Sequence, residues 1–286
     1  MDNRIQLTVV ILTFNEEINI RQSISNVIGW AKAVYILDSG STDKTVQIAQ
    51  ELGAKIFYRK FDTYAKQRNY AIKKLPIETE WILFLDADEY LTNELKQEIR
   101  NTLIMPDAEG YLIKYRFYFM NKWIKHGGYY GTKILRLFKK SNAYVDRDMN
   151  EHIIINGTIK ELKNDFIHKD NKGVSDWIEK HNRYATFEAL ELIKYEKRKR
   201  ENTTDEMANL FGTQVEQKRW IREYIWNPLL PPLIRPFIYY FYRYIIRFGF
   251  LDGKEGFIFH FLHGLWFYFI IDVKYIEIKR KEKCVE

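Results

Sequence analysis

Three carboxylates, Asp86, Asp88 and Glu89, follow directly after the apolar residues 81–85. An apolar run of this length between polar residues is typical of a fully buried strand, and in open α/β sheets ligands bind beyond the carboxyl ends of such strands. Two aspartates one residue apart can share a divalent cation that also binds the phosphates of a nucleotide. The stretch therefore predicts a metal-assisted nucleotide site.

The same aspartate spacing recurs at Asp146 and Asp148, where no comparable apolar run precedes it. The position after a buried strand, and not the motif alone, therefore supports the site at Asp86. The sequence contains no Gly-x-Gly-x-x-Gly segment at the first predicted helix and no Gly-x-x-x-x-Gly-Lys-Ser/Thr segment anywhere. It thus lacks both the dinucleotide fingerprint and the Walker-type phosphate loop.

The elements that must position these residues follow an alternating pattern of strand and helix. Strands are predicted at residues 7–12, 33–37, 54–58, 80–85, 110–120 and 133–139. Helical spacing of apolar residues occurs between them, for example at 64–75, where Pro76 ends the helix, and later at 91–103 and 174–200. We therefore expect an α/β fold with a Rossmann-like, mostly parallel sheet and helices on both faces.

Polar residues also follow two other predicted strands. Thr13, Asn15 and Glu16 come after the first strand, and Asp38 comes after the second. Because the carboxyl ends of parallel strands meet at one edge of a sheet, we expect these side chains to line a single crevice together with Asp86.

The C-terminal part of the chain has a different composition. Four prolines between residues 228 and 236 mark a linker or a sharp entry, and aromatic-rich helices are predicted at 237–251 and 257–271. The second predicted helix is shorter than the roughly 20 residues that a transmembrane helix needs. We interpret both as lying at an anionic membrane surface, with Arg243 and Arg247 on one helical face. The alternative is that they pack against the N-terminal domain or a dimer partner.

Composition places the chain among globular proteins with a sizeable core, since 46% of its 286 residues are hydrophobic. A net charge of +7 suits an anionic partner. The basic residues are dispersed and the aromatic residues cluster with aliphatic ones, so nucleic-acid binding is not predicted. The single cysteine, Cys284, excludes an internal disulfide framework, and no signal-peptide pattern opens the sequence. We expect a cytoplasmic protein.

Four motifs occur in order along the chain: VILTFNEE at residues 10–17, DSGSTD at 38–43, KQRN at 66–69 and DADE at 86–89. Together they resemble family 2 glycosyltransferases, which have the GT-A fold, and more narrowly the bacterial enzymes that build lipopolysaccharide core and related surface glycans. The resemblance covers nearly the whole chain and is strongest to about residue 90. The glycine-containing segment from Phe248 to Phe257 also resembles the tail of that subgroup.

The resemblance implies an inverting transfer of a sugar from a nucleotide diphosphate sugar, usually UDP-linked, to a hydroxyl of a lipid-linked or lipopolysaccharide-type acceptor. The predicted helix at 174–200 and the change in composition after it place the end of the catalytic unit near residue 200, so we expect a GT-A catalytic domain at residues 1–200 and a helical, aromatic-rich extension at 201–286. The resemblance also implies a peripheral location on the inner face of the bacterial cytoplasmic membrane.

A role follows for each residue that matches the family motifs. The residues implied to contact the nucleotide sugar are Thr13, Asn15 and Glu16 beside the nucleotide, Asp38 at the base, Arg68 at the diphosphate and Asp86 at the ribose or a metal-bound water. Asp88 would bind Mn²⁺ or Mg²⁺ directly, and His168 would complete the metal shell, with Asp86 close by. The alternatives are structural: helix caps for Asn15 and Asp38, a solvated helix position for Arg68, and a hydrogen-bonded histidine at 168.

An inverting displacement needs a base within hydrogen-bond reach of the acceptor hydroxyl. We choose Glu151, in Asn150-Glu151-His152, and keep Asp148 as the reserve candidate. Similar enzymes commonly show His-Glu here, whereas this chain has the histidine after the glutamate.

Two other functions fit parts of the pattern. A sugar-phosphate nucleotidyltransferase shares the sheet but usually carries a Gly-rich, Lys-containing loop after the first strand, which residues 13–17 lack. A catalytically silent nucleotide-sugar binder in a glycan-assembly complex would keep the same residues, and only turnover distinguishes it from an enzyme.

Overall fold

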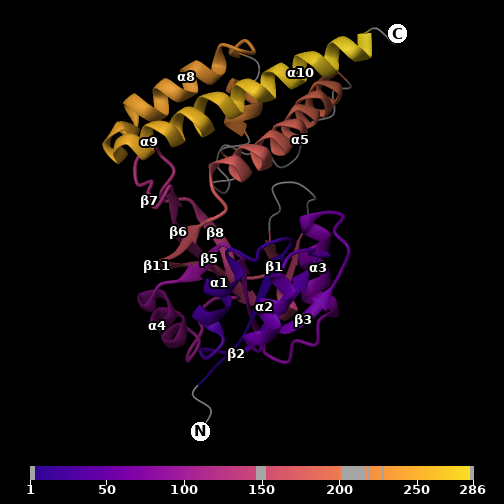
Figure 1. The fold of residues 1–286 in the computed structure, drawn as a ribbon, viewed down its shortest axis with the longest axis vertical. Coiled ribbons are helices and arrows are strands. Elements are labelled where there is room, and N and C mark those ends of the chain that lie inside the picture. Colours follow the sequence, from indigo (N-terminus) through magenta and orange to yellow (C-terminus); the bar gives the residue numbers. More distant parts are fainter. Residues whose placement is uncertain (1–3, 146–152, 201–216, 218–219, 227–228, 284–286) are drawn as a thin grey trace. The chain divides into compact units, whose positions relative to one another are not determined.

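The computed structural model describes residues 4–145, 153–200, 217, 220–226 and 229–283 (Figure 1). Packing divides the chain into two compact units. The first contains Met1–Trp123 and Tyr129–Lys172, and the second contains Ile124–Gly128 and Gly173–Glu286.

The first unit is built on a nine-stranded sheet. In spatial order its strands are β3 (Lys55–Tyr58), β2 (Ala31–Asp38), β1 (Ile5–Thr13), β4 (Trp81–Asp86), β8 (Lys133–Lys139), β6 (Gly110–Phe119), β11 (Ile159–Lys169) and β5 (Glu89–Leu91), with β7 (Lys122–Trp123) beside β6. The pairs within β3–β2–β1–β4 are parallel, as is β6 with β11. In contrast, β8 and β5 join their neighbours antiparallel, so the parallel half carries the alternating strand and helix pattern.

Helices cover both faces of this sheet, as the sequence predicts. The helices of the first unit are α1 (Ile20–Val27), α2 (Thr45–Glu51), α3 (Tyr64–Lys74) and α4 (Asn93–Thr102). One core contains Ile24 of α1 and Leu95 of α4, and the core on the other face contains Ile72 of α3. Along β1, Val9 belongs to the first core and Val10 to the second, which is the alternation of a strand buried on both faces. The expected α/β fold is confirmed.

The register of the parallel strands brings their carboxyl ends together. Thr13 of β1 pairs with Asp38 of β2, and Leu12 of β1 pairs with Asp86 of β4. The polar residues that follow these strands therefore start from one edge of the sheet. A separate two-stranded sheet, β9 (Ala143–Val145) with β10 (Ile153–Ile155), completes the first unit.

The second unit is helical. Its elements are α5 (Val174–Arg200), η2 (Ile221–Trp226), α8 (Arg235–Phe241), η3 (Tyr242–Ile246), η4 (Gly249–Asp252), α9 (Gly253–Phe259), η5 (His260–Trp266) and α10 (Phe267–Lys283). The expected aromatic-rich helical extension is therefore present. The helix predicted at 257–271 is longer than expected, because α9, η5 and α10 continue one another. By length and composition the stretch Gly249–Glu282 could cross a membrane, and a third of its most apolar window is buried.

Helix α5 precedes the predicted domain boundary at residue 200, but it packs with the helices that follow that boundary. Ala185, Ala189 and Ile193 of α5 form a core with Ile271 and Tyr275 of α10. Packing therefore places α5 in the second unit, whereas the sequence analysis assigned it to the catalytic domain. The apolar face of α5 was evident from the sequence, but its partner depends on tertiary structure.

Candidate functional site

Asp88 and His168 meet where β4 turns into β5. His168 on β11 pairs with Glu89 at the start of β5, and the backbone N–H of Lys169 donates to the carbonyl of Asp88 at 2.8 Å. This pairing brings Oδ2 of Asp88 to 3.1 Å from Nε2 of His168. The carboxylate and the imidazole are 10% and 27% exposed, so both are partly accessible to a ligand.

The two donor atoms have a separation that suits neighbouring ligands of an octahedral ion. With bonds of about 2.1 Å, two such donors lie about 3.0 Å apart. A carboxylate and a neutral imidazole form a ligand set that Mn²⁺ accepts. Within the described part of the chain, no group of three His, Cys, Asp or Glu side chains converges on one point. The pair therefore fits an ion that takes its other ligands from water or phosphate oxygens, as Mg²⁺ commonly does.

Asp86 is engaged by two arginines. Its oxygens accept from Arg136 at 2.7 Å and from Arg68 at 3.3 Å, and its side chain is 38% exposed. Burial alone would raise the pKa of Asp86, but Arg136 and Arg68 hold it far below its usual range. Arg68 is itself buried, which excludes a solvated helix position. In this structure Asp86 is therefore an anion fixed by arginines beside the Asp88 and His168 pair.

Glu89 lies beneath this network and is almost completely buried. Its carboxylate accepts from Arg136 at 2.6 Å and from the backbone N–H of Asp86 at 2.9 Å. Burial raises the pKa of Glu89 to about 7. The positive charge of Arg136 lowers this pKa, and the negative charge of Asp86 raises it. Arg136 thus joins the strand carrying Asp86 to the strand that begins at Glu89. The sequence analysis missed Arg136, and its only signal was a charged residue inside the alternating strand 133–139.

Asp38 organises the loop that follows β2. Its carboxylate accepts four hydrogen bonds, from Thr13 Oγ1, Gly40 N, Ser41 N and Ser41 Oγ, at 2.6–2.8 Å. A carboxylate offers about four lone-pair positions, so internal donors use all of them. A hydrogen bond from a nucleotide base to Asp38 would have to displace one of these donors.

The loop after β1 is joined to the segment that follows His168. Asn15 has a left-handed backbone with φ of 54°, and its side-chain oxygen accepts from Thr42 N at 2.8 Å. Glu16 accepts from Lys172 Nζ at 2.5 Å, and each side chain is 20% exposed. Burial raises the pKa of Glu16, although Lys172 opposes that change. Lys172 was not predicted, and it adds a cation next to the segment that carries His168.

Helix α3 connects the strand ends through consecutive side chains of the Lys-Gln-Arg-Asn motif. Gln67 donates to Ser39 Oγ at 2.7 Å, and Arg68 contacts Asp86. Asn69 donates to the carbonyl of Val145 at 2.6 Å and accepts from its N–H at 2.9 Å. The motif therefore holds three separate segments together: the loop after β2, the end of β4 and the end of β9.

The candidate bases Glu151 and Asp148 lie outside the described residues. The flanking residues Val145 and Ile153 pair antiparallel as part of β9 and β10, and the backbone N–H of Val145 donates to Asn69 of α3.

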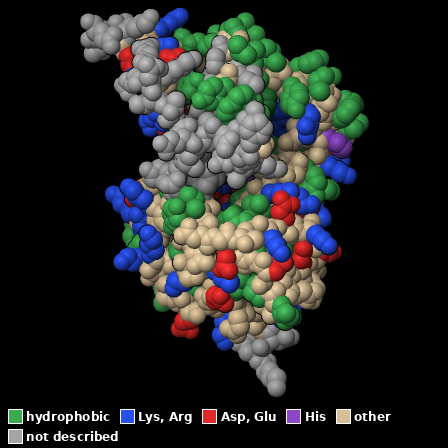
Figure 2. All heavy atoms as spheres, turned by 180° about the vertical axis from the view of Figure 1, so that it is seen from behind, with side chains coloured by type: hydrophobic (Ala, Val, Ile, Leu, Met, Phe, Trp, Pro, Cys, Tyr) green, Lys and Arg blue, Asp and Glu red, His purple; other side chains and the backbone are tan. Residues whose placement is uncertain are grey.

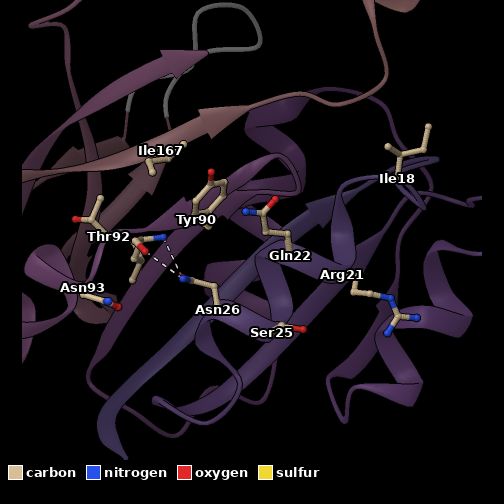
Figure 3. A pocket seen from close by; sticks show the side chains of 10 residues that line it. Ile18, Arg21, Gln22, Ser25, Asn26, Tyr90, Thr92, Asn93 and Ile167 are labelled. Atoms are coloured by element: carbon tan, nitrogen blue, oxygen red, sulfur yellow. Dashed lines mark hydrogen bonds between the residues drawn. The ribbon is translucent and has the colours of Figure 1, made fainter. Parts of the chain in front are cut away.

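A cleft of about 670 Å³ lies on the face of β5 and β11 that is opposite to His168 (Figure 3). Tyr90 and Ile167 line it, and these residues pair with each other. Adjacent residues of a strand point to opposite faces, so this cleft and His168 lie on opposite faces of the β5–β11 pair. The cleft therefore contains none of the predicted site residues.

Comparison with known proteins identifies a family. The model of glycosyl transferase family 2 matches residues 8–158, more than half of the chain. An uncharacterized glycosyltransferase of Rickettsia felis is 26% identical over 266 residues, covering 88% of this chain and 83% of its own length. An uncharacterized glycosyltransferase of Rickettsia typhi is 27% identical over 206 residues, covering 68% and 70%.

Solved structures show weaker similarity. S. aureus TarS 1-349 in complex with UDP-GlcNAc is 16% identical, covers 96% of this chain and 92% of its own, and has a TM-score of 0.44. Glucosyl-3-phosphoglycerate synthase from Mycobacterium tuberculosis, in complex with Mn²⁺, UDP and glucosyl-3-phosphoglycerate, is 19% identical, covers 39% and 44%, and has a TM-score of 0.33. On the match over residues 8–158, this chain is a glycosyltransferase that belongs to glycosyl transferase family 2.

Proposed function

We propose that this chain transfers a sugar from a nucleotide diphosphate sugar, with UDP as the nucleotide, to a hydroxyl of a lipid-linked or lipopolysaccharide-type acceptor. The transfer inverts the anomeric centre, requires Mn²⁺ or Mg²⁺ and takes place at the inner face of the cytoplasmic membrane. The observation that carries the proposal is the 3.1 Å approach of Asp88 Oδ2 to His168 Nε2 beside the joined strand ends.

Asp88 and His168 would hold the metal ion through one oxygen and one nitrogen. When bound, the ion would offset the negative charge that develops on the leaving nucleoside diphosphate, so no protein acid is needed to protonate it. Arg68 and Arg136 keep Asp86 ionised and fixed next to this pair. The protein thereby presents a preorganised anionic edge to the cation and the ribose.

Lys172 supplies positive charge on the donor side. Its ammonium is paired with Glu16 in this structure and remains 20% exposed. A diphosphate carries more negative charge than the Glu16 carboxylate, so we assign Lys172 to the donor phosphates. Thr13, Asn15 and Asp38 would shape the nucleotide pocket, Asp38 chiefly by holding its loop through four hydrogen bonds.

The acceptor side of the reaction needs a base. In the proposed step the acceptor oxygen bonds to the anomeric carbon, the bond to the diphosphate oxygen breaks, and the hydroxyl proton passes to Glu151. Asp148 is the reserve base. We retain residues 1–200 as the part that carries the catalytic residues, although α5 packs with the second unit.

A donor screen tests the proposal. Purified protein is incubated with a panel of UDP-sugars, with and without Mn²⁺, and UDP release and sugar transfer are measured. We expect Mn²⁺-dependent turnover, and a loss of more than about a hundredfold for Asp88→Ala, because metal stabilisation of a leaving group contributes several kcal/mol. Asp107→Ala, at an exposed carboxylate paired with Lys160, is the matched control and should remain active. Binding of a UDP-sugar without turnover under any of these conditions would contradict the enzymatic proposal.

A further inference from the structure

The polarity of the helices between residues 234 and 273 is inverted relative to a water-soluble helical hairpin. The side chains that point inward include charged and titratable ones, all at most 6% exposed: Arg235, Arg243, Asp252, His260 and Asp272. Charged side chains in a protein surrounded by water are rarely buried in this way unless they are paired. Because the polar side chains of these helices point inward, the side chains that point outward are mainly apolar.

Four of these five inward groups have hydrogen-bond partners inside the helical unit, whereas neither ring nitrogen of His260 has one among the described residues. Arg235 Nε donates to Asp272 at 2.9 Å, which ties the start of α8 to α10. Arg243 Nε donates to the carbonyl of Gly127 at 3.0 Å, and the Asp252 carboxylate accepts from His126 N at 2.8 Å. Polar groups that face the interior and pair there are what a protein needs when its outside is apolar.

The outward side chains form two apolar stripes. On α8 and η3 they recur at helical spacing, and on η4, α9 and η5 a second series runs beside them. Between 41% and 57% exposed, this apolar face consists of Phe237, Ile238, Phe241, Tyr242, Ile245, Ile246, Phe248, Phe250, Leu251, Phe257 and Phe261. Figure 2 shows hydrophobic side chains gathered on the surface of the helical unit. Soluble monomers rarely expose apolar patches of this extent.

Charge at the apolar face is positive. Arg247, at the turn between the two stripes, and Lys254, in the first turn of α9, are exposed, whereas the acidic residues from 229 to 272 are buried or, at Glu255, half-buried. A two-fold dimer through this face would bring its own cations toward one another. An anionic lipid surface instead complements them.

We infer that the apolar face of α8, η3, η4, α9 and η5 lies in the headgroup and upper acyl region of a bilayer containing anionic lipids. Its aromatic and aliphatic side chains enter the apolar boundary, while Arg247 and Lys254 reach the headgroups. In this arrangement the stretch Gly249–Glu282, which by length and composition could also cross a membrane, lies along the bilayer surface.

This inference deepens the proposed function, because it identifies the surface that would bring the enzyme to a lipid-linked acceptor. Its test is separate, since binding to vesicles is measured without any sugar donor. A failure of vesicle binding would leave UDP-sugar turnover intact, and a failure of turnover would leave vesicle binding intact.

The experiment is co-flotation of the full chain with vesicles of phosphatidylcholine containing about 30% phosphatidylglycerol. We expect the wild type to bind and the pair Phe237→Gln with Phe241→Gln to bind at least about tenfold more weakly, because two apolar anchors are lost. The matched control is Ile104→Gln with Met105→Gln, two exposed apolar residues of the first unit, which should bind like the wild type. Arg247→Gln with Lys254→Gln should reduce the preference for anionic vesicles by about tenfold.

A second variant distinguishes the loss of a membrane contact from misfolding of the protein. Phe241→Trp keeps an aromatic residue with a strong preference for the membrane interface, so it should bind at least as well as the wild type and show a blue-shifted emission with vesicles. The inference is overturned if the wild type does not float with vesicles or if the Phe237 and Phe241 pair binds unchanged. It is also overturned if sedimentation velocity shows a dimer that this pair dissociates without any change in vesicle binding.

Discussion

Replacing Arg136 by methionine tests the buried charge network beside Asp88 and His168. The Arg136 side chain is 4% exposed and bonds to both Asp86 and Glu89. Removing one partner of a buried ion pair costs about 3–5 kcal/mol of unfolding free energy. Asp86 keeps Arg68 at 3.3 Å and partial contact with water, whereas Glu89, at 1% exposure, loses the arginine with which it forms an ion pair. We therefore expect Arg136→Met to lower the unfolding free energy by about 3 kcal/mol at mildly alkaline pH, which is the lower end of this range. Most of the loss should come from the unpaired Glu89.

The size of this loss depends on pH. The pKa of Glu89 is raised from 4.5 to about 7 by burial, and the loss of Arg136 raises it further. A carboxyl with a raised pKa in the folded state stabilises the fold below its unfolded pKa, and that stability is lost as pH rises through the folded pKa. The difference between Arg136→Met and the wild type should thus be small near about pH 5 and should grow above pH 7.

Urea denaturation monitored by circular dichroism and tryptophan fluorescence measures the effect. The control is Arg183→Met, whose pair with Glu179 is 65% and 71% exposed and should contribute less than about 0.5 kcal/mol. Adding Glu89→Gln to Arg136→Met should restore part of the stability, because the unpaired buried charge is removed. If Arg136→Met is no more destabilising than Arg183→Met, or if its effect is independent of pH, the electrostatic argument is wrong.

Three other predictions concern single side chains. His168→Gln should weaken Mn²⁺ binding in the presence of UDP by at least about tenfold, measured by titration calorimetry. Lys172→Met should raise the KM for the UDP-sugar by about tenfold with a smaller change in kcat, because a charge-assisted hydrogen bond is lost. Burial lowers the pKa of His181 to about 4 from 6.5, so its neutral form stabilises the fold above pH 6.5 and that stability is lost as the pH falls toward 4. His181→Phe should reduce this acid sensitivity by about 1–2 kcal/mol in thermal melts.

Each of these predictions has an outcome that would contradict it. Wild-type Mn²⁺ affinity in His168→Gln would exclude the histidine from the metal shell. Lys163→Met changes an exposed lysine on the same strand as His168 and should leave the KM unchanged. An equal rise in KM for both lysine variants would show that Lys172 acts only through the net charge of the protein and not through a direct contact with the donor. A pH profile of His181→Phe that matches the wild type would show that His181 does not contribute to acid sensitivity.

Several elements could be predicted because their signals are local. The apolar residues 81–85 form the buried part of β4, and the alternation of strands and helices predicts the parallel half of the sheet. The partner of α5 could not be predicted in this way. A periodic apolar stripe shows that a helix has a buried face, but many surfaces of similar composition could cover it.

The sequence by itself determined which residues end the strands, and therefore that Thr13, Asp38 and Asp86 start from one edge. That follows because parallel strands joined by helices place their carboxyl ends together. Only the tertiary structure decided that Asp88 meets His168, through the antiparallel register of β5 with β11, and that Arg136 fixes Asp86. Periodicity assigns a side chain to a face of its strand, whereas the register between distant strands depends on packing across the whole sheet.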